Sequence, residues 1–275
     1  MSFVSTKEKS SEKVIIRECL AIEEFQACVD LQTAAFNLSP AESSPLRHFI
    51  VSKRAGGWTL GAFKTDGDDA LVGFVHHLVG LRETAQAREV IGYSHMMAVA
   101  PEFQNQGLGA RLKWAQRERA LREDVTFINW TWDPMQARNA HFNINRLGVV
   151  VSEYAQNFYG TNYLDCDPSD GLQSDRLFAD WHLNSRRVNL ISDGATPEIN
   201  EKPVVTIQIH ADWNQTKKDD PEFARSELLR VRLEFREALA KGLICAGFKR
   251  DETNPSYLFY KDQAISSADY TDEPR

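Results

Sequence analysis

The residues from Tyr93 to Gly109 are the ones in this chain whose types and spacing could do chemistry. They begin as an apolar run that ends at Pro101, which predicts a buried strand, and Gly107 and Gly109 then open a predicted helix. Glycines let the backbone come close to a ligand, and the first turn of a helix carries unpaired N–H groups and a partial positive charge. This junction therefore suits a phosphate group, although a tight strand-to-helix turn without a ligand has the same pattern.

The spacing within the turn narrows the kind of phosphate site. The residues from Gln104 to Gly109 form the pattern Gln-x-x-Gly-x-Gly. A Walker loop needs Gly-Lys-Ser/Thr, and the dinucleotide-binding fingerprint needs a third glycine. Both of those sites are disfavoured.

His95 is the candidate proton acceptor beside this turn. Tyr93 lies two residues earlier, and the two side chains share a face of the predicted strand because strand side chains alternate. An unperturbed imidazole titrates near about 6.5, so His95 could accept a proton at neutral pH. The alternatives are a histidine satisfied within the core and a base role shared through water.

Alternating strands and helices must position these residues. Before the loop, the hydrophobic pattern predicts strands at 14–16, 58–63, 70–81 and 91–100, and helices from Ile22 and over 46–53. After the loop it predicts a helix over 110–122, a strand over 125–132, a helix to Leu147 closed by Gly148, and a strand over 149–154. We expect Asp133 to be the N-cap of the helix that ends at Leu147, with Pro134 at its first position.

Composition and charge exclude several function classes. The chain has 275 residues and a formal net charge of -7, with no basic run that would suggest a nucleic-acid groove. No apolar run approaches the roughly 18 residues of a membrane span, and the N-terminus has no signal-peptide core. We therefore expect a cytoplasmic protein that binds neither nucleic acid nor membrane.

The residue types that bind metals do not form a recognisable site. No metal or redox spacing relates the four cysteines, Cys19, Cys28, Cys166 and Cys245. We expect them to be buried or free thiols in a reducing cytosol. His76 and His77 point to opposite faces of one predicted strand, so that strand alone cannot form a metal centre from them.

The motifs around the loop resemble a known family. Gln104-x-x-Gly107-x-Gly109 after the apolar segment Met97-Ala98-Val99 resembles the acyl-CoA pyrophosphate loop of the GNAT superfamily of N-acetyltransferases. Downstream, the run from Trp130 to Pro134, then Arg138-Asn139-Ala140-His141-Phe142-Asn143 and Leu147-Gly148, resembles a subgroup of predicted acetyltransferases with a C-terminal α/β extension. The resemblance covers roughly Val14 to Leu183.

This resemblance implies a fold and a cosubstrate. The fold would be α/β, a GNAT acyl-CoA N-acyltransferase with a mixed central sheet flanked by helices. The strands that end near Val99 and Trp132 would splay apart, and the pantetheine arm of acetyl-CoA or another acyl-CoA would insert between them. Cofactor contacts would come from Met97, Ala98 and Val99, and from the loop residues Gln104, Asn105, Gln106, Gly107, Leu108, Gly109 and Ala110. Asn139 matches the subgroup motif and is either a further cofactor contact or the donor of an internal hydrogen bond.

The family's catalytic residues are only partly matched. The usual base, a Glu on the strand before the loop, falls on Tyr93, and His95 is the nearest candidate for its role. The usual acid, a Tyr four residues before the glycine that closes the next helix, falls on Ile144. Tyr154 and Tyr159 follow soon after, and Tyr159 is our candidate acid. Packing tyrosines with hydrogen-bonded hydroxyl groups are the alternative.

The rest of the chain predicts a companion lobe. We predict a core strand around Asp175–Trp181, a strand over 204–209, a helix capped by Asp220 with Pro221 first, and strands over 243–248 and 256–261. The predicted domains are a flexible tail 1–12, the GNAT core 13–183, a linker 184–202, a C-terminal lobe 203–262 and a disordered tail 263–275. The lobe would cover the site, shape the acceptor pocket or form a homodimer contact.

The predicted function is transfer of an acetyl group from acetyl-CoA to an amine of a small molecule or peptide by direct attack, without a metal. A non-catalytic acyl-CoA sensor or regulatory protein is the alternative, favoured by the missing Glu and Tyr. A scaffold with an empty cleft is a third possibility.

Overall fold

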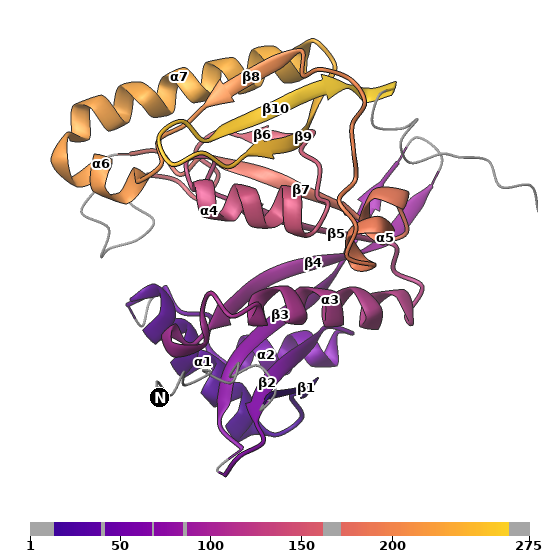
Figure 1. The fold of residues 1–275 in the computed structure, drawn as a ribbon. Helices are drawn as coiled ribbons and strands as arrows, with labels where there is room; N and C mark the ends of the chain where they lie inside the picture. Colours follow the sequence, from indigo (N-terminus) through magenta and orange to yellow (C-terminus); the bar gives the residue numbers. More distant parts are fainter. Residues whose placement is uncertain (1–13, 40–41, 68, 85–86, 162–171, 264–275) are drawn as a thin grey trace, which may run out of the picture. The chain divides into compact units, whose positions relative to one another are not determined.

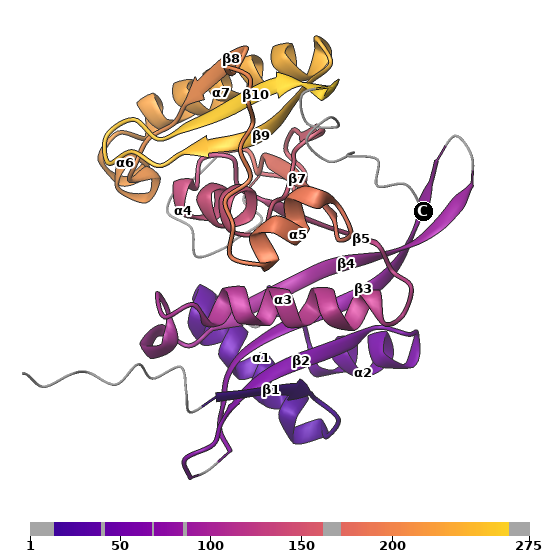
Figure 2. The same cartoon turned by 45° about the vertical axis from the view of Figure 1, so that its right-hand side comes forward.

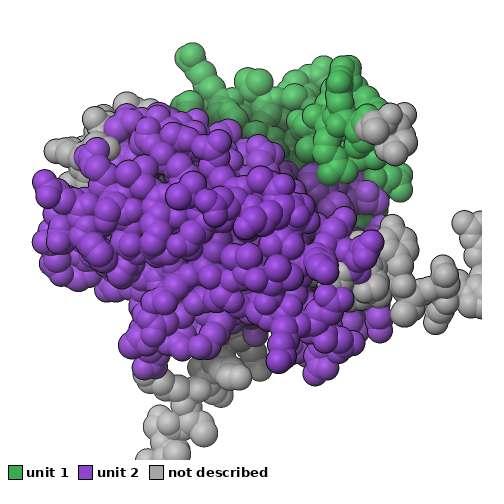
Figure 3. All heavy atoms as spheres, turned by 90° about the horizontal axis from the view of Figure 1, so that it is seen from above, with its two compact units in different colours: residues 1–124 green, residues 125–275 purple. Residues whose placement is uncertain are grey.

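The computed structural model describes residues 14–39, 42–67, 69–84, 87–161 and 172–263. The chain divides into two compact units, Met1–Asp124 (unit 1) and Val125–Arg275 (unit 2), which are coloured separately in Figure 3. The predicted tail 1–12 and all but the first residue of the predicted tail 263–275 lie outside the described residues.

Unit 1 is a four-stranded antiparallel sheet with helices on both faces (Figure 1). Its strands lie in the order β1-β2-β3-β4. The elements are β1 (Val14–Glu18), α1 (Ile22–Phe36), α2 (Leu46–Arg54), β2 (Trp58–Lys64), β3 (Leu71–Glu83), β4 (Arg88–Val99), the 3₁₀ turn Pro101–Phe103 and α3 (Leu108–Leu121). Each predicted element of this half is confirmed to within a few residues at its ends.

The alternation of side chains along β3 divides its residues between the helices on the two faces. Phe74 packs against Phe49 of α2 in the main apolar cluster of the unit. Gly73 faces α3, and a Cβ at this position would lie 3.1 Å from Cδ1 of Leu112. The absence of a side chain at Gly73 therefore lets α3 lie close against the sheet, which sets where the loop before α3 begins.

A β-bulge interrupts the pairing of β3 with β4 beside His95. His77 pairs with Ser94, but the preceding residue His76 pairs with Met96, so His95 is an extra residue in β4. A bulge bends the strand and re-aims the side chains on either side of it. It follows that His95 stands out of the regular ladder at the point where the sequence predicted the proton acceptor.

Unit 2 contains two antiparallel three-stranded arrangements, β5-β7-β6, labelled in Figure 1, and β8-β10-β9, seen in Figure 2. Its elements are β5 (Phe127–Trp132), α4 (Ala137–Ala140), a π-helical segment (His141–Arg146), β6 (Tyr154–Ala155), β7 (Arg176–His182), α5 (Arg186–Ser192), β8 (Val205–Gln208), α6 (Trp213–Asp219), α7 (Pro221–Ala240), β9 (Leu243–Lys249) and β10 (Ser256–Lys261). The range predicted as a linker, 184–202, includes α5, and α6 was not predicted at all.

The helix after β5 does not begin as the sequence predicted. Asp133 is not its N-cap, because α4 begins at Ala137 after an extended Gln136. The Asp133 carboxylate instead accepts the N–H of Met135, at 2.8 Å, within a turn. The carbonyl of Pro134 in that turn accepts the hydroxyl of Tyr257 at 2.8 Å. This contact with the C-terminal sheet favours the turn over a first helical turn at the same residues.

The segment 149–154 is also less regular than predicted. Val150 and Val151 form single bridges to Asp180 and Cys245, and the strand proper is only Tyr154–Ala155. Val151 thus bonds to β9 rather than continuing a ladder with β7.

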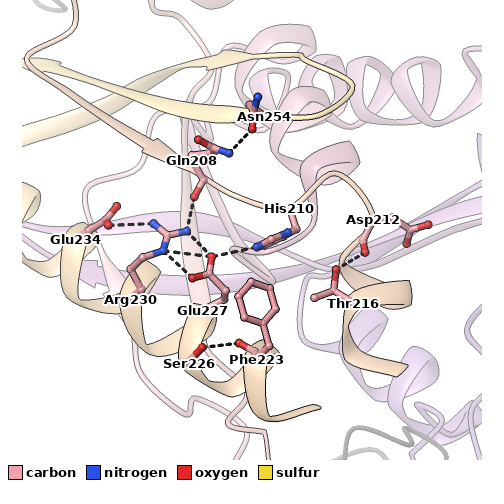
Figure 4. Close-up of polar contacts among 10 residues, drawn as sticks. All are labelled: Gln208, His210, Asp212, Thr216, Phe223, Ser226, Glu227, Arg230, Glu234 and Asn254. Atoms are coloured by element: carbon pink, nitrogen blue, oxygen red, sulfur yellow. Dashed lines mark hydrogen bonds and ion pairs between the residues drawn. The ribbon is translucent and has the colours of Figure 1, made fainter. Parts of the chain in front are cut away.

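Helix α7 is anchored to unit 2 by charge pairs of two kinds. Arg232 is buried and donates to both carboxylate oxygens of Asp175, at 2.7 and 2.9 Å. Arg230 is partly exposed and bonds Glu227 and Glu234 and the carbonyl of Gln208 (Figure 4).

Candidate active site

The predicted phosphate loop has the backbone geometry of an anion site. After the 3₁₀ turn, Asn105 adopts a positive φ of 59° and Gly107 one of 84°, and α3 then begins at Leu108. Two side chains brace the loop from within. Gln104 Nε2 donates to the carbonyl of Val99 at 3.0 Å, and Gln106 Nε2 donates to that of Glu102 at 2.6 Å.

Gly107 leaves open space in front of the helix. A Cβ built at this residue would meet no atom within 4 Å, so crowding is not the reason for a glycine here. The positive φ is one reason, because a side chain is strained in that conformation. The space also allows a ligand to come close to the backbone.

The N-terminal turn of α3 supplies the donors. The N–H groups of Leu108, Gly109 and Ala110 have no acceptor inside the helix, whereas Arg111 N–H bonds the carbonyl of Gly107 at 3.1 Å. No acidic residue lies in this turn. The helix end thus keeps its partial positive charge, which favours a phosphate.

The strand residues predicted to contact the cofactor lie at the end of β4. Met97 pairs with Val75, and Val99 with Gly73 of β3. The side chain of Ala98 is buried in the apolar cluster of unit 1, so a cofactor could contact Ala98 only through its backbone groups. Within unit 1, β4 is the last strand of the order, and its backbone leads directly to the loop.

His95 is held by the connection between α1 and α2. The Oγ atom of Ser44 lies 3.1 Å from His95 Nε2. Ser44 is itself fixed by the fully buried Gln32, whose amide bonds the Ser44 carbonyl at 2.7 Å and the Ser44 N–H at 3.2 Å. Helix α1 therefore determines where the hydroxyl that orients His95 stands.

Three imidazoles gather at this point in unit 1. The ring centroid of His48 on α2 lies 4.8 Å from that of His95 and 5.2 Å from that of His76. Both nitrogens of His76 are occupied, since Ser52 lies 3.0 Å from Nε2 and Thr59 lies 2.8 Å from Nδ1. In His48, Nε2 is buried and has no hydrogen-bond partner among the described residues.

The environment of the cluster disfavours protonation. Burial lowers the pKa of His76 to about 3, with smaller effects from the neighbouring imidazoles. Burial, and then the charge of His48, lower the pKa of His95 to about 4, and burial lowers that of His48. His95 is exposed to solvent, so water limits the lowering of its pKa. For all three rings the shift of the pKa favours the neutral form.

Side chains of α3 form hydrogen bonds to Ser94, the residue of β4 that precedes His95. Ser94 accepts from the buried Lys113, at 3.0 Å, and its hydroxyl bonds Gln116 at 3.2 Å. Burial lowers the pKa of the Lys113 ammonium. The residue next to His95 in the chain is therefore held by a polar cluster beneath α3.

The other two predicted catalytic residues, Tyr93 and Tyr159, belong to different units. Tyr93 is half-buried on β4 in unit 1. Tyr159 belongs to unit 2, where its exposed hydroxyl lies 3.2 Å from Thr131 Oγ1 of β5. Ile144, at the family's acid position, is fully buried. The hydroxyl of Tyr154 donates to Asp175 at 2.5 Å. This phenol therefore belongs to the hydrogen bonds that join Asp175 to Arg232 of α7.

Asn139 lies on α4 in unit 2 with its side chain exposed, and no hydrogen bond joins it to another described residue. No group of three or more histidine, cysteine or acidic residues within the described ranges is arranged to hold a metal ion.

Sequence reasoning missed Gln32, Ser44 and His48. Each lies on or beside a correctly predicted helix, but only the packing of α1 and α2 against β4 brings them to His95. The polarity of Gln32 at an interior position of a helix was the one available signal. A polar group in such a position needs a bonding partner.

Comparison with known families decides what this site belongs to. Residues 25–148 match the model of the acetyltransferase (GNAT) family, a range that runs from α1 through the loop to Gly148. Residues 25–148 are thereby identified as a GNAT acetyltransferase domain. The predicted fold class and enzyme class are thereby confirmed. Among the described residues, no helix is long and apolar enough to cross a membrane. None of the curated proteins compared with the chain matches it.

Solved acetyltransferase structures resemble part of the chain. The acetyltransferase of the GNAT family from Streptococcus pneumoniae is 16% identical, with 61% of this chain and 98% of that one covered at a TM-score of 0.45. The ribosomal-protein-S18-alanine N-acetyltransferase from Escherichia coli is 14% identical, covering 62% and 94% at 0.45. Naa20 from Chaetomium thermophilum, in complex with a bisubstrate analogue, is 16% identical, covering 60% and 85% at 0.46. With scores this low, these likenesses carry no argument about the acceptor.

Proposed function

We propose that this GNAT domain uses acetyl-CoA as its acyl donor and transfers the acetyl group to an amine of a small molecule or peptide. The observation that carries the proposal is the open turn at Gly107, which stands in front of the free N–H groups that begin α3. These groups would bind the pyrophosphate of CoA. The ends of β4 at Met97 and Val99 would pair with the pantetheine arm, and Asn139 remains a proposed cofactor contact.

The proposed reaction is direct attack. The amine nitrogen forms a bond to the thioester carbon, the carbon–sulfur bond breaks, and the sulfur leaves as a thiolate. The amine loses one proton, which His95 accepts, and the thiolate gains one, for which Tyr159 is the candidate donor. The described cysteines are all buried, which supports a reaction without an acyl-cysteine intermediate.

The protonation state of His95 suits this role. An imidazole that is neutral at pH 7 has a lone pair available, and Ser44 fixes the Nε2 side of the ring. If Nε2–H donates to Ser44, Nδ1 is the atom that takes the proton from the amine. Tyr93, on the same strand, would line the approach.

Two measurements test the proposal. Isothermal titration with acetyl-CoA and CoA measures binding, and thiol release with a panel of amines measures turnover. We expect binding, turnover of at least one amine, and a fall in kcat of ten-fold or more in His95→Ala and in Tyr159→Phe with acetyl-CoA affinity retained. Absence of acetyl-CoA binding would contradict the proposal. Binding without turnover of any amine would favour the non-catalytic sensor.

A further inference from the structure

The groups around His95 bear on the kind of amine that the domain accepts. Ser44, His48 and His76 surround the ring, from the α1–α2 connection, α2 and β3. None of these groups is an acid. The nearest carboxylate along the chain, Glu42, accepts the N–H of Ser39 at 2.8 Å.

An ammonium group would be bound weakly beside these rings. A cation is bound well where a carboxylate compensates its lost hydration. Here the partners in unit 1 are neutral imidazoles, and a nearby positive charge further disfavours protonation of each of them. An amine that reaches His95 uncharged avoids this cost.

The cluster also has an unused hydrogen-bonding atom. The buried Nε2 of His48 bonds no described residue, and its ring lies beside that of His95, which is accessible to solvent. A buried polar atom without a partner is unfavourable unless a ligand or a water satisfies it. With its proton on Nε2, His48 would donate to the lone pair of a neutral amine, which an ammonium lacks.

We propose that the imidazole cluster of His48, His76 and His95 selects weakly basic acceptors, such as the α-amine of a peptide or an aromatic amine, against strongly basic ones such as a lysine side chain. This inference rests on the proposed acetyl transfer and specifies its substrate class. His95 accepts the proton, and His48 is a specificity-determining residue that keeps the neighbourhood free of negative charge.

The expected selectivity follows from the fraction of each amine that is neutral. At pH 7 an α-amine with a pKa of about 7.7–8.0 is roughly 10–17% neutral, and a lysine ε-amine with a pKa of about 10.4 is roughly 0.04% neutral. If only neutral amines react and reach the site equally well, kcat/KM differs between them by roughly 300-fold.

The test uses two isomers of one compound, lysine amide acetylated either on the ε-nitrogen, which leaves the α-amine free, or on the α-nitrogen, which leaves the ε-amine free. We expect wild-type kcat/KM at pH 7 to favour the free α-amine by roughly 300-fold. His48→Glu places a carboxylate beside His95 and should narrow that ratio at least ten-fold. His48→Gln, which is similar in size, uncharged and keeps an N–H donor, should leave the ratio as in the wild type.

The outcomes separate this inference from the proposed function. A wild-type ratio near one, an equal ratio in His48→Glu and His48→Gln, or acetyl-CoA binding without acetylation of either isomer would overturn the inference. Titration with acetyl-CoA in the same samples reports on the cosubstrate site and on folding. Failure of the wild-type protein to bind acetyl-CoA would overturn the proposed function itself.

Discussion

Replacing Arg232 with methionine should destabilise unit 2 strongly. The guanidinium makes two hydrogen bonds to Asp175, and the two side chains are only 9% and 0% exposed. Methionine keeps much of the length of the side chain but leaves the carboxylate buried without its cation. The hydroxyl of Tyr154 and the N–H of Asn157 remain as its donors.

The magnitude follows from this burial. Removing one partner of a buried ion pair costs about 3–5 kcal/mol, because the remaining charge has lost its compensation. Arg230→Met on the same helix is the matched control, since Arg230 is 35% exposed and its partners Glu227 and Glu234 are 15% and 37% exposed, so water reaches these pairs. Exposed pairs contribute about 1 kcal/mol or less.

Urea denaturation measures both variants. Tryptophan fluorescence follows unit 2, which holds four of the six tryptophans, Trp130, Trp132, Trp181 and Trp213. We expect the free energy of unfolding to fall by several kcal/mol in Arg232→Met and by about 1 kcal/mol or less in Arg230→Met. Equal losses in the two variants, or a loss below about 1 kcal/mol in Arg232→Met, would refute the reasoning.

Three further predictions concern the other parts of the chain. Gln32→Leu removes both hydrogen bonds that fix Ser44 and should lower kcat about ten-fold with acetyl-CoA affinity unchanged, whereas an unchanged kcat would show that Ser44 does not orient His95. Asp220→Ala removes the side chain that accepts the N–H of Phe223 at the start of α7, and should cost about 1 kcal/mol in urea denaturation. Lowering the pH should destabilise unit 1, because the folded pKa of His76 is depressed to about 3 while the unfolded chain protonates near about 6.5. The stability is full above about pH 6.5 and is lost as the pH falls toward 3, by up to about 1.4 kcal/mol per pH unit for this group, and His76→Gln should reduce that slope.

The elements of unit 1 could be predicted because their signals are local. The apolar run of β4, the break at Pro101 and the glycines before α3 each act within a few residues, and the structure has all three where the sequence places them. The same holds for α7, where Asp220 and Pro221 determine the start of the helix.

The failures have non-local causes. Asp133 and Pro134 carry a standard helix opening, but a tyrosine more than a hundred residues away bonds the turn and the helix starts later. The bulge at His95 arises from the pairing of two strands, which the alternation of residues in one strand does not reveal. His48 reaches His95 only through helix packing, so no spacing in the sequence indicates their contact.

The most direct test of the central claim is the affinity of acetyl-CoA for Gly107→Glu and Gly107→Gln, measured by isothermal titration. Both side chains enter the open space at the turn and strain the same positive φ, but only glutamate adds a negative charge before the N–H groups of α3. If these groups bind the pyrophosphate, the glutamate variant should bind acetyl-CoA at least ten-fold more weakly than the glutamine variant, and both more weakly than the wild type. Wild-type affinity in Gly107→Glu would contradict the assignment of this turn as the CoA site.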